Sequence, residues 1–176
     1  MEQENITNNY RHILKPLSNN KITKYDFVGF DVETYGDTNE FYIGGLYYFT
    51  KNKKETFKVF DNKEEMINFL LSDKFKNKYI VATNLGFDLT ALFFNTKQWN
   101  ELNILESGSN IIYADYTFKN SNKKGKIKFI DTMNYAPFSV DKLGKILKIP
   151  KLDKPECLGK IPKNNEERQI LITYNK

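Results

Sequence analysis

Two acidic residues follow an apolar run near the start of the chain. Residues 25–30 are mostly apolar, and Asp31 and Glu33 come directly after them. The run is apolar on both faces, which is typical of a central strand. Side chains alternate faces along a strand, so both carboxylates should point the same way. Neighbouring carboxylates repel each other and are costly to desolvate, and a pair of hard metal ions commonly compensates them. An acidic turn after the strand is the alternative interpretation.

The composition limits the chemistry that is available. A chain of 176 residues, 40% of them hydrophobic, suits one domain, and we expect a polar, flexible leader over residues 1–24 and the domain over residues 25–176. No stretch approaches the roughly 18 apolar residues of a membrane span, so no membrane partner is expected. The single cysteine, Cys157, excludes a disulfide framework and a cysteine-based metal cluster, and the single histidine, His12, lies in the leader. Catalysis is expected to use carboxylates, tyrosines, lysines and metals.

The chain is basic, with a net charge of +5 and a pI of about 9.0. This charge suits a polyanionic partner, although a solvated lysine surface gives the same count. The lysines of two expected hairpin tips, residues 51–54 and 119–125, are open to both interpretations. Lys, Asn, Ile, Phe and Tyr are abundant and have A/T-rich codons, which fits a viral, plasmid or organellar source and therefore an infected cell or a mitochondrion.

Periodicity and turn residues predict the order of the elements. Helices are expected to begin at Asp61 and Asn164, each with Glu at the third following position, after the turn at residues 84–86, and at Ser139. Strands are expected over residues 25–33, 41–50, 55–60, 78–83, 110–118 and 126–130. A three-strand meander followed by strand–helix alternation predicts an α/β domain, a mixed sheet with helices on its faces.

A second acidic signal lies at the start of the second expected helix. Asp88 follows a short buried strand by a few residues, at the edge of an α/β sheet where ligands collect. A carboxylate there also gains from the helix dipole, which is the purely structural explanation. Asn84 and Phe87 flank it, with an amide that can donate to a base or sugar and a ring that can stack on a base or lie in the core.

Together these segments resemble the 3′–5′ proofreading exonuclease domain of family B DNA polymerases, especially the protein-primed branch of phages, viruses and linear plasmids. The first motif of that family, Asp-x-Glu-Thr, matches residues 31–34, and the second, Asn-x-x-Phe-Asp, matches residues 84–88. The third, Tyr-x-x-x-Asp, is matched only at Tyr174. Residues 129–133 are similar to the segment in which Ser or Thr followed by an apolar residue contacts the single strand.

The resemblance implies a ribonuclease-H-like fold and Mg²⁺- or Mn²⁺-dependent removal of nucleotides from a DNA 3′ end. It implies that Asp31, Glu33 and Asp88 hold two metal ions and that Tyr174 orients the attacking water. It also implies that five residues hold the frayed single-stranded terminus: Thr34, Asn84, Phe87, Thr132 and Met133. The remaining polymerase chain would be a partner, as would a terminal protein primer.

The chain departs from the family pattern at its end. The fourth acid of the site would fall at position 178, so we expect a domain truncated within its last helix and lacking the polymerase site. Asp131 could substitute as a ligand, or it could cap the turn that follows it. Two alternatives therefore stay open, a non-catalytic nucleic-acid-binding remnant of such a polymerase and an exoribonuclease of the same superfamily.

Overall fold

The computed structural model describes residues 22–108, 110–119, 125–149 and 151–175. The leader expected over residues 1–24 lies almost wholly outside these ranges, and so does most of the second hairpin tip. Among the described residues, no helix has both the length and the apolar character needed to cross a membrane.

The centre of the molecule is one mixed sheet of seven strands, in the order β3-β2-β1-β4-β7-β6-β5. The strands β1, β4 and β7 run parallel at its centre, and every other neighbouring pair is antiparallel. This is the expected α/β arrangement, and it is ribonuclease-H-like. The strands are β1 Phe27–Tyr35, β2 Glu40–Phe49, β3 Glu55–Phe60, β4 Tyr79–Ala82, β5 Leu102–Ser107, β6 Asn110–Thr117 and β7 Lys126–Asp131.

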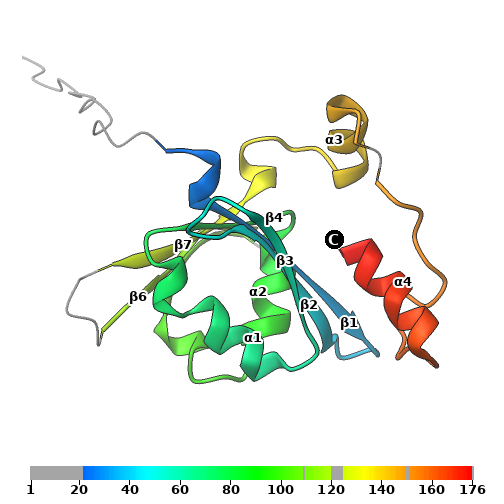
Figure 1. Cartoon of the computed structure of the whole chain (residues 1–176). Coiled ribbons are helices and arrows are strands. Elements are labelled where there is room, and N and C mark those ends of the chain that lie inside the picture. The colour runs from blue at the N-terminus through cyan, green and yellow to red at the C-terminus, as the bar shows by residue number, and fades with distance from the viewer. Residues whose placement is uncertain (1–21, 109, 120–124, 150, 176) are drawn as a thin grey trace, which may run out of the picture.

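The helices divide between the two faces of the sheet. Figure 1 shows α1 and α2 together on one side of β1–β3 and α4 on the other, with α3 apart from both near the top of the view. The α-helices are α1 Lys63–Leu70, α2 Leu85–Phe93, α3 Val140–Leu147 and α4 Asn165–Asn175. The described residues also include four single 3₁₀ turns, η1 Lys24–Asp26, η2 Asp73–Phe75, η3 Trp99–Glu101 and η4 Thr132–Asn134.

The alternation of β1 separates the core from the candidate site. Val28, Phe30 and Val32 are buried in the core that the sheet forms with α1 and α2. The intervening residues, which include Asp31 and Glu33, therefore face the other side. This burial pattern confirms the sequence prediction that the two carboxylates lie on the same face of the strand.

Three local expectations need correction. Asn62, not Asp61, caps α1, with its side-chain oxygen 2.9 Å from the backbone nitrogen of Glu65. The sequence also predicts that Gly44 and Gly45 interrupt the second strand, but β2 runs through both glycines without a break. The strand β5 was not expected at all, because it is an edge strand whose outer residues are mostly exposed and whose pairing comes only from β6. The expected cap of α4 is confirmed, since the Asn164 side chain accepts a hydrogen bond from the Glu167 nitrogen.

Candidate active site

Two of the three predicted carboxylates come from the same face of β1. Asp31 lies opposite Gly45 of β2, and Glu33 lies opposite Ile43. The register shifts immediately after Glu33, between Glu33 and Thr34. Such a bulge bends the strand and redirects the next side chain. The two acids are therefore at the last regular positions of β1 before the ladder is disturbed.

The third carboxylate, Asp88, reaches the same strand from α2. Asp88 is only 2% exposed, and its Oδ1 accepts a hydrogen bond of 2.8 Å from the backbone nitrogen of Val32. Val32 lies between Asp31 and Glu33 in the chain. This bond therefore fixes the first turn of α2 against the part of β1 that carries the two acids. It joins two segments of the chain that are 56 residues apart.

Burial raises the pKa values of all three carboxylates, and the charge of Asp31 raises those of Glu33 and Asp88 further. Protein atoms crowd Asp31, although it opens to solvent on one side, and the lost hydration raises its pKa to about 6 against the opposing charge of Lys151. Burial and then the charge of Asp31 raise the pKa of Glu33 to about 7. Burial and then the charge of Asp31 raise the pKa of Asp88 to about 8. This is the signature of negative charges gathered without enough compensation.

The end of α4 closes one side of the site. The side-chain amide of Asn175 donates a hydrogen bond of 2.6 Å to Asp31 Oδ2. Its Oδ1 is buried and has no hydrogen-bond partner among the described residues. Gly45 makes this approach possible, because a Cβ at that position would collide with Asn175 Oδ1. The neighbouring Tyr174 is half-buried, and its ring lies under the ammonium of Lys151, with Nζ 5.3 Å from the ring centroid.

Three contributors to the site were not predicted from the sequence. Lys151 lies in a segment without any catalytic pattern, Asn175 is an unspecified position of the third motif that begins at Tyr174, and Gly45 was expected only to interrupt a strand. The only sequence signal for Gly45 is that a small residue lies opposite an acid in a pair of strands. This signal can be used only when the register of the two strands is known. Lys151 and Lys154 are the cations that counter the charge of Glu33.

The donor set suits a hard divalent cation. Carboxylate oxygens are the ligands that Mg²⁺ and Mn²⁺ prefer, and a cation would offset the cost of burying these negative charges and the repulsion between them. The orphaned Oδ1 of Asn175 adds a buried neutral acceptor beside Asp31. Within the described residues, however, no three carboxylate, thiolate or imidazole groups already have the geometry of a metal site. The residues fit the ions in chemistry, and binding would require their side chains to move.

Two of the five predicted strand-holding residues, Thr132 and Phe87, line hollows in the surface. Asp31, Thr132 and Asn175 share a hollow of about 390 Å³ on the open face of the sheet. Phe87 belongs to a larger one, of about 890 Å³, between α2 and the turn that follows β1. Phe87 is 39% exposed, so its interpretation as a core residue is wrong.

The other residues predicted to contact the single strand are polar or exposed to solvent. Thr34 lies at the bulge with its hydroxyl 3.5 Å from Asn39 Oδ1. Asn84 is exposed, in a left-handed conformation with φ of 63°. Thr132 shares a 2.8 Å hydrogen bond with Thr83, and Met133 is 43% exposed.

Asp131 is a capping residue. Its carboxylate accepts hydrogen bonds from the backbone nitrogens of Asn84, at 3.2 Å, Leu85, at 3.0 Å, and Met133, at 2.8 Å. It thus caps both η4 and the start of α2. With these donors occupying its oxygens, the structure favours the capping interpretation over that of a fourth metal ligand.

Comparisons with known proteins reveal a likeness of fold. No protein-family model matches the chain, and no curated protein matches it in sequence. A solved structure described as phi29 DNA polymerase complexed with single-stranded DNA superimposes with a TM-score of 0.63 at 15% identity over 83% of this chain. The same polymerase with primer-template DNA gives 0.63 at 16% identity over 83% of the chain, and its orthorhombic crystal form gives 0.61 at 16% over 85%.

The chain spans 28–29% of the length of those polymerase chains. Identities this low reveal the fold and leave the activity open. The chain therefore has the fold of one region of phi29 DNA polymerase.

Proposed function

We propose that the chain is the 3′–5′ exonuclease region of a family B DNA polymerase of the protein-primed type, which hydrolyses nucleotides from DNA 3′ ends. The observation that carries the proposal is the convergence of Asp31, Glu33 and Asp88, whose pKa values are all raised to between about 6 and 8. Strongly shifted carboxylates that meet at one point of a fold are typical of functional sites.

Each residue has a role in this proposal. Asp31, Glu33 and Asp88 hold two Mg²⁺ or Mn²⁺ ions, which when bound supply an activated water and neutralise the leaving oxygen. Tyr174 positions that water through its phenol, which can donate and accept hydrogen bonds. The amide of Asn175 fixes the orientation of Asp31.

The substrate in the proposal is a single-stranded DNA 3′ terminus. Thr132 and Met133 hold it on the side of Asp31, while Phe87 stacks on a base on the side of α2 and Thr34 and Asn84 supply polar contacts. The remaining polymerase chain and a terminal protein primer are the proposed partners. The likeness of fold to a polymerase solved with single-stranded DNA supports this substrate class.

The test measures metal binding and hydrolysis separately. Titration of Mn²⁺ into the metal-free chain, followed by calorimetry, should reveal binding that Asp31→Asn and Asp88→Asn weaken at least tenfold. Glu106→Gln, at an exposed position on β5, is the matched control and should bind as the parent does. A 5′-labelled DNA oligonucleotide should be shortened from its 3′ end in Mg²⁺ or Mn²⁺ and should persist with either aspartate variant.

A second candidate function is a non-catalytic nucleic-acid-binding module. Its supporting observation is that an amide, that of Asn175, is hydrogen-bonded to Asp31, and that the described residues hold no preformed metal cluster. Absence of Mn²⁺ binding together with retained DNA binding would favour this candidate and reject hydrolysis. Faster cleavage of an RNA oligonucleotide than of its DNA counterpart would instead indicate an exoribonuclease, whose site must accept the 2′-hydroxyl.

A further inference from the structure

A second hollow, distant from the carboxylates, combines positive charge with aromatic rings. It lies where β1 begins, between the tip of the β2–β3 hairpin and η2, and has a volume of about 710 Å³. That volume is within the range of ligand sites, roughly 300–1,000 Å³. We call it the basic cleft, and define it by the lining residues that matter here: Phe27, Phe49, Lys51, Lys53, Lys74 and Lys78.

The positive charge of the basic cleft is largely uncompensated. Of its lysines, Lys78 pairs with Asp26 at 3.2 Å. The one carboxylate in the lining, Asp73, lies 3.8 Å from Lys76, which is outside the cleft. Among the described residues, the other three cleft lysines make no ion pair with a carboxylate within 4.0 Å. The cleft therefore concentrates cations that are available to an anion.

These lysines lie against aromatic rings. The ammonium of Lys53 is 5.0 Å from the centroid of Tyr25, and that of Lys74 is 4.0 Å from the centroid of Tyr48. Phe27 is 40% exposed, with its centroid 5.5 Å from that of Tyr79. An exposed ring beside unpaired ammonium groups offers stacking for a base and attraction for the phosphates on either side of it.

The lysine-bearing hairpin tip is held in place by its own hydrogen bonds. The Thr50 nitrogen donates to the Lys54 carbonyl oxygen at 2.9 Å, and the Lys53 nitrogen donates to the Thr50 carbonyl oxygen at 2.8 Å. The ring of Phe49, just before the tip, packs edge-on against Tyr25 with centroids 5.1 Å apart. A ligand would therefore meet cations on an ordered support, which lowers the entropy lost on binding.

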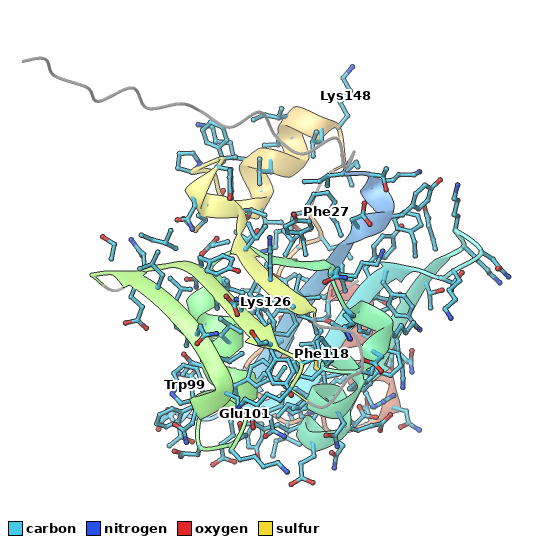
Figure 2. All side chains as sticks on the ribbon, turned by 90° about the vertical axis from the view of Figure 1, so that its left-hand side faces the viewer. Phe27, Trp99, Glu101, Phe118, Lys126 and Lys148 are labelled. Atoms are coloured by element: carbon cyan, nitrogen blue, oxygen red, sulfur yellow. The ribbon has the colours of Figure 1, made fainter. Side chains whose placement is uncertain are left out.

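The basic cleft is separate from the carboxylate site. Phe27 and Asp31 are four residues apart on β1, about 13 Å at the usual rise of a strand, and have the same parity. Figure 2 places Phe27 near the start of β1, far from Trp99 and Glu101 at the opposite end of the molecule.

We propose that the basic cleft is a binding site for single-stranded nucleic acid, with Phe27 stacking on a base and Lys51, Lys53 and Lys74 contacting phosphates. The cations account for affinity toward the backbone, and the rings account for a requirement for unpaired bases. The site acts whether or not the carboxylates are catalytic, because it needs no metal ion and none of the three acids.

The test measures fluorescence anisotropy of labelled dT8 and U8 with the whole chain in EDTA, which prevents metal-dependent hydrolysis. Lys51→Gln/Lys53→Gln/Lys74→Gln should lower affinity about tenfold or more at low salt. It should also reduce the slope of log K against log salt by about 2, because each lost phosphate contact on a single strand accounts for about 0.7. Phe27→Ala should lower affinity about fivefold or more, since one stacked base contributes roughly 1–3 kcal/mol.

The matched control removes the same charge elsewhere. Lys97→Gln/Lys160→Gln/Lys163→Gln changes three exposed lysines that do not line the cleft, and should alter affinity less than twofold. Circular dichroism melting verifies that every variant is folded, and Phe27→Ala tests the cleft without changing charge. Equal losses in both triple variants would overturn the proposal, as would equal affinity for an abasic oligomer, or no binding of dT8 in 20 mM salt at a protein concentration of about 1 mM.

Discussion

Asp88 and Asp131 are both buried aspartates near the start of α2, yet their environments differ. They are 2% and 7% exposed. Asp131 accepts backbone hydrogen bonds from Asn84, Leu85 and Met133. Asp88 accepts one from another segment, that of Val32, and faces Asp31 and Glu33 across it. One carboxylate is surrounded by donors, and the other by further acids.

The difference separates a structural role from a functional one. Hydrogen bonds from three backbone N–H groups satisfy the oxygens of Asp131 and tie η4 to the start of α2. Asp88 has its pKa raised to about 8, so the fold alone does not stabilise its charge. An acid kept in so unfavourable a place is explained by a partner that the protein chain does not provide, which is the basis of the metal proposal.

The largest expected effect comes from removing Asp131, the carboxylate whose oxygens are fully hydrogen-bonded. Asp131→Ala leaves three backbone N–H groups without their acceptor, and should lower the free energy of unfolding by about 2–4 kcal/mol. Urea denaturation at pH 7 measures it. Asp153→Ala, at an exposed position, is the control and should change stability by less than about 0.5 kcal/mol. An equally small loss for Asp131→Ala would remove the contrast.

Removing the charge of Asp88 should stabilise the protein at high pH, whereas removing Asp131 should destabilise it. The pKa of Asp88 is about 3.8 when unfolded and about 8 when folded, so the folded state retains a proton that the unfolded state releases. Its contribution to stability is therefore complete below about pH 4 and is lost as the pH rises through about 8. In EDTA, Asp88→Asn should be more stable than the parent by at least about 1 kcal/mol at pH 8 and nearly equal to it at pH 4.

Urea denaturation across this pH range tests the Asp88 prediction. Parallel stability curves for the parent and Asp88→Asn would contradict it. Added Mn²⁺ should stabilise the parent at pH 8 and leave Asp88→Asn little changed, because binding to the folded state alone raises stability.

Gly45→Ala tests whether the side-chain amide of Asn175 is a necessary hydrogen-bond donor to Asp31, as the backbone N–H groups are to Asp131. The added Cβ would collide with Asn175 Oδ1 and approach the ring of Phe57, so stability should fall by about 1–2 kcal/mol. The signal of the Asn175 side-chain amide in NMR spectra should move as its bond to Asp31 is lost. Gly86→Ala is the matched control, because its Cβ would approach nothing closer than 3.9 Å. An unmoved amide signal in Gly45→Ala would reject the steric account.

The smallest expected effect comes from removing the charge of Lys151. Lys151 lowers the pKa values of Asp31 and Glu33, so Lys151→Met should raise both. The rise should be less than about half a pH unit, because water screens an exposed ammonium. Carboxyl ¹³C titration by NMR measures it, with the exposed Lys148→Met as the control. A fall in either pKa would contradict the assignment of Lys151 as a compensating charge.

Much of the fold was predictable because it depends on local pattern. The apolar run before Asp31 predicted a buried strand, and the Ser139 and Asn164 caps start α3 and α4 as expected. The strand β5 escaped prediction because its partner, β6, and not its own composition, makes it a strand. The cap of α1 was placed one residue early, since Asp61 instead pairs with Arg168, 107 residues away.

The candidate site divides in the same way. Asp31, Glu33 and Asp88 were identifiable because motifs preserve their spacing, and the fold brings them together. Asn175 could not be identified, since its contact with Asp31 spans 144 residues and depends on the empty space above Gly45. The metal ions and the role of Tyr174 stay predictions.

The hydrogen bonds of Asp131 also have a consequence for folding kinetics. They join the end of β7 to the start of α2 across 46 and 47 residues, so loop closure must precede them. The first turn of α2 gains its cap only when β7 has joined the sheet, and Asp88 lies in that turn. We therefore expect the carboxylate cluster to gain its full support only after β7 has docked beside β4.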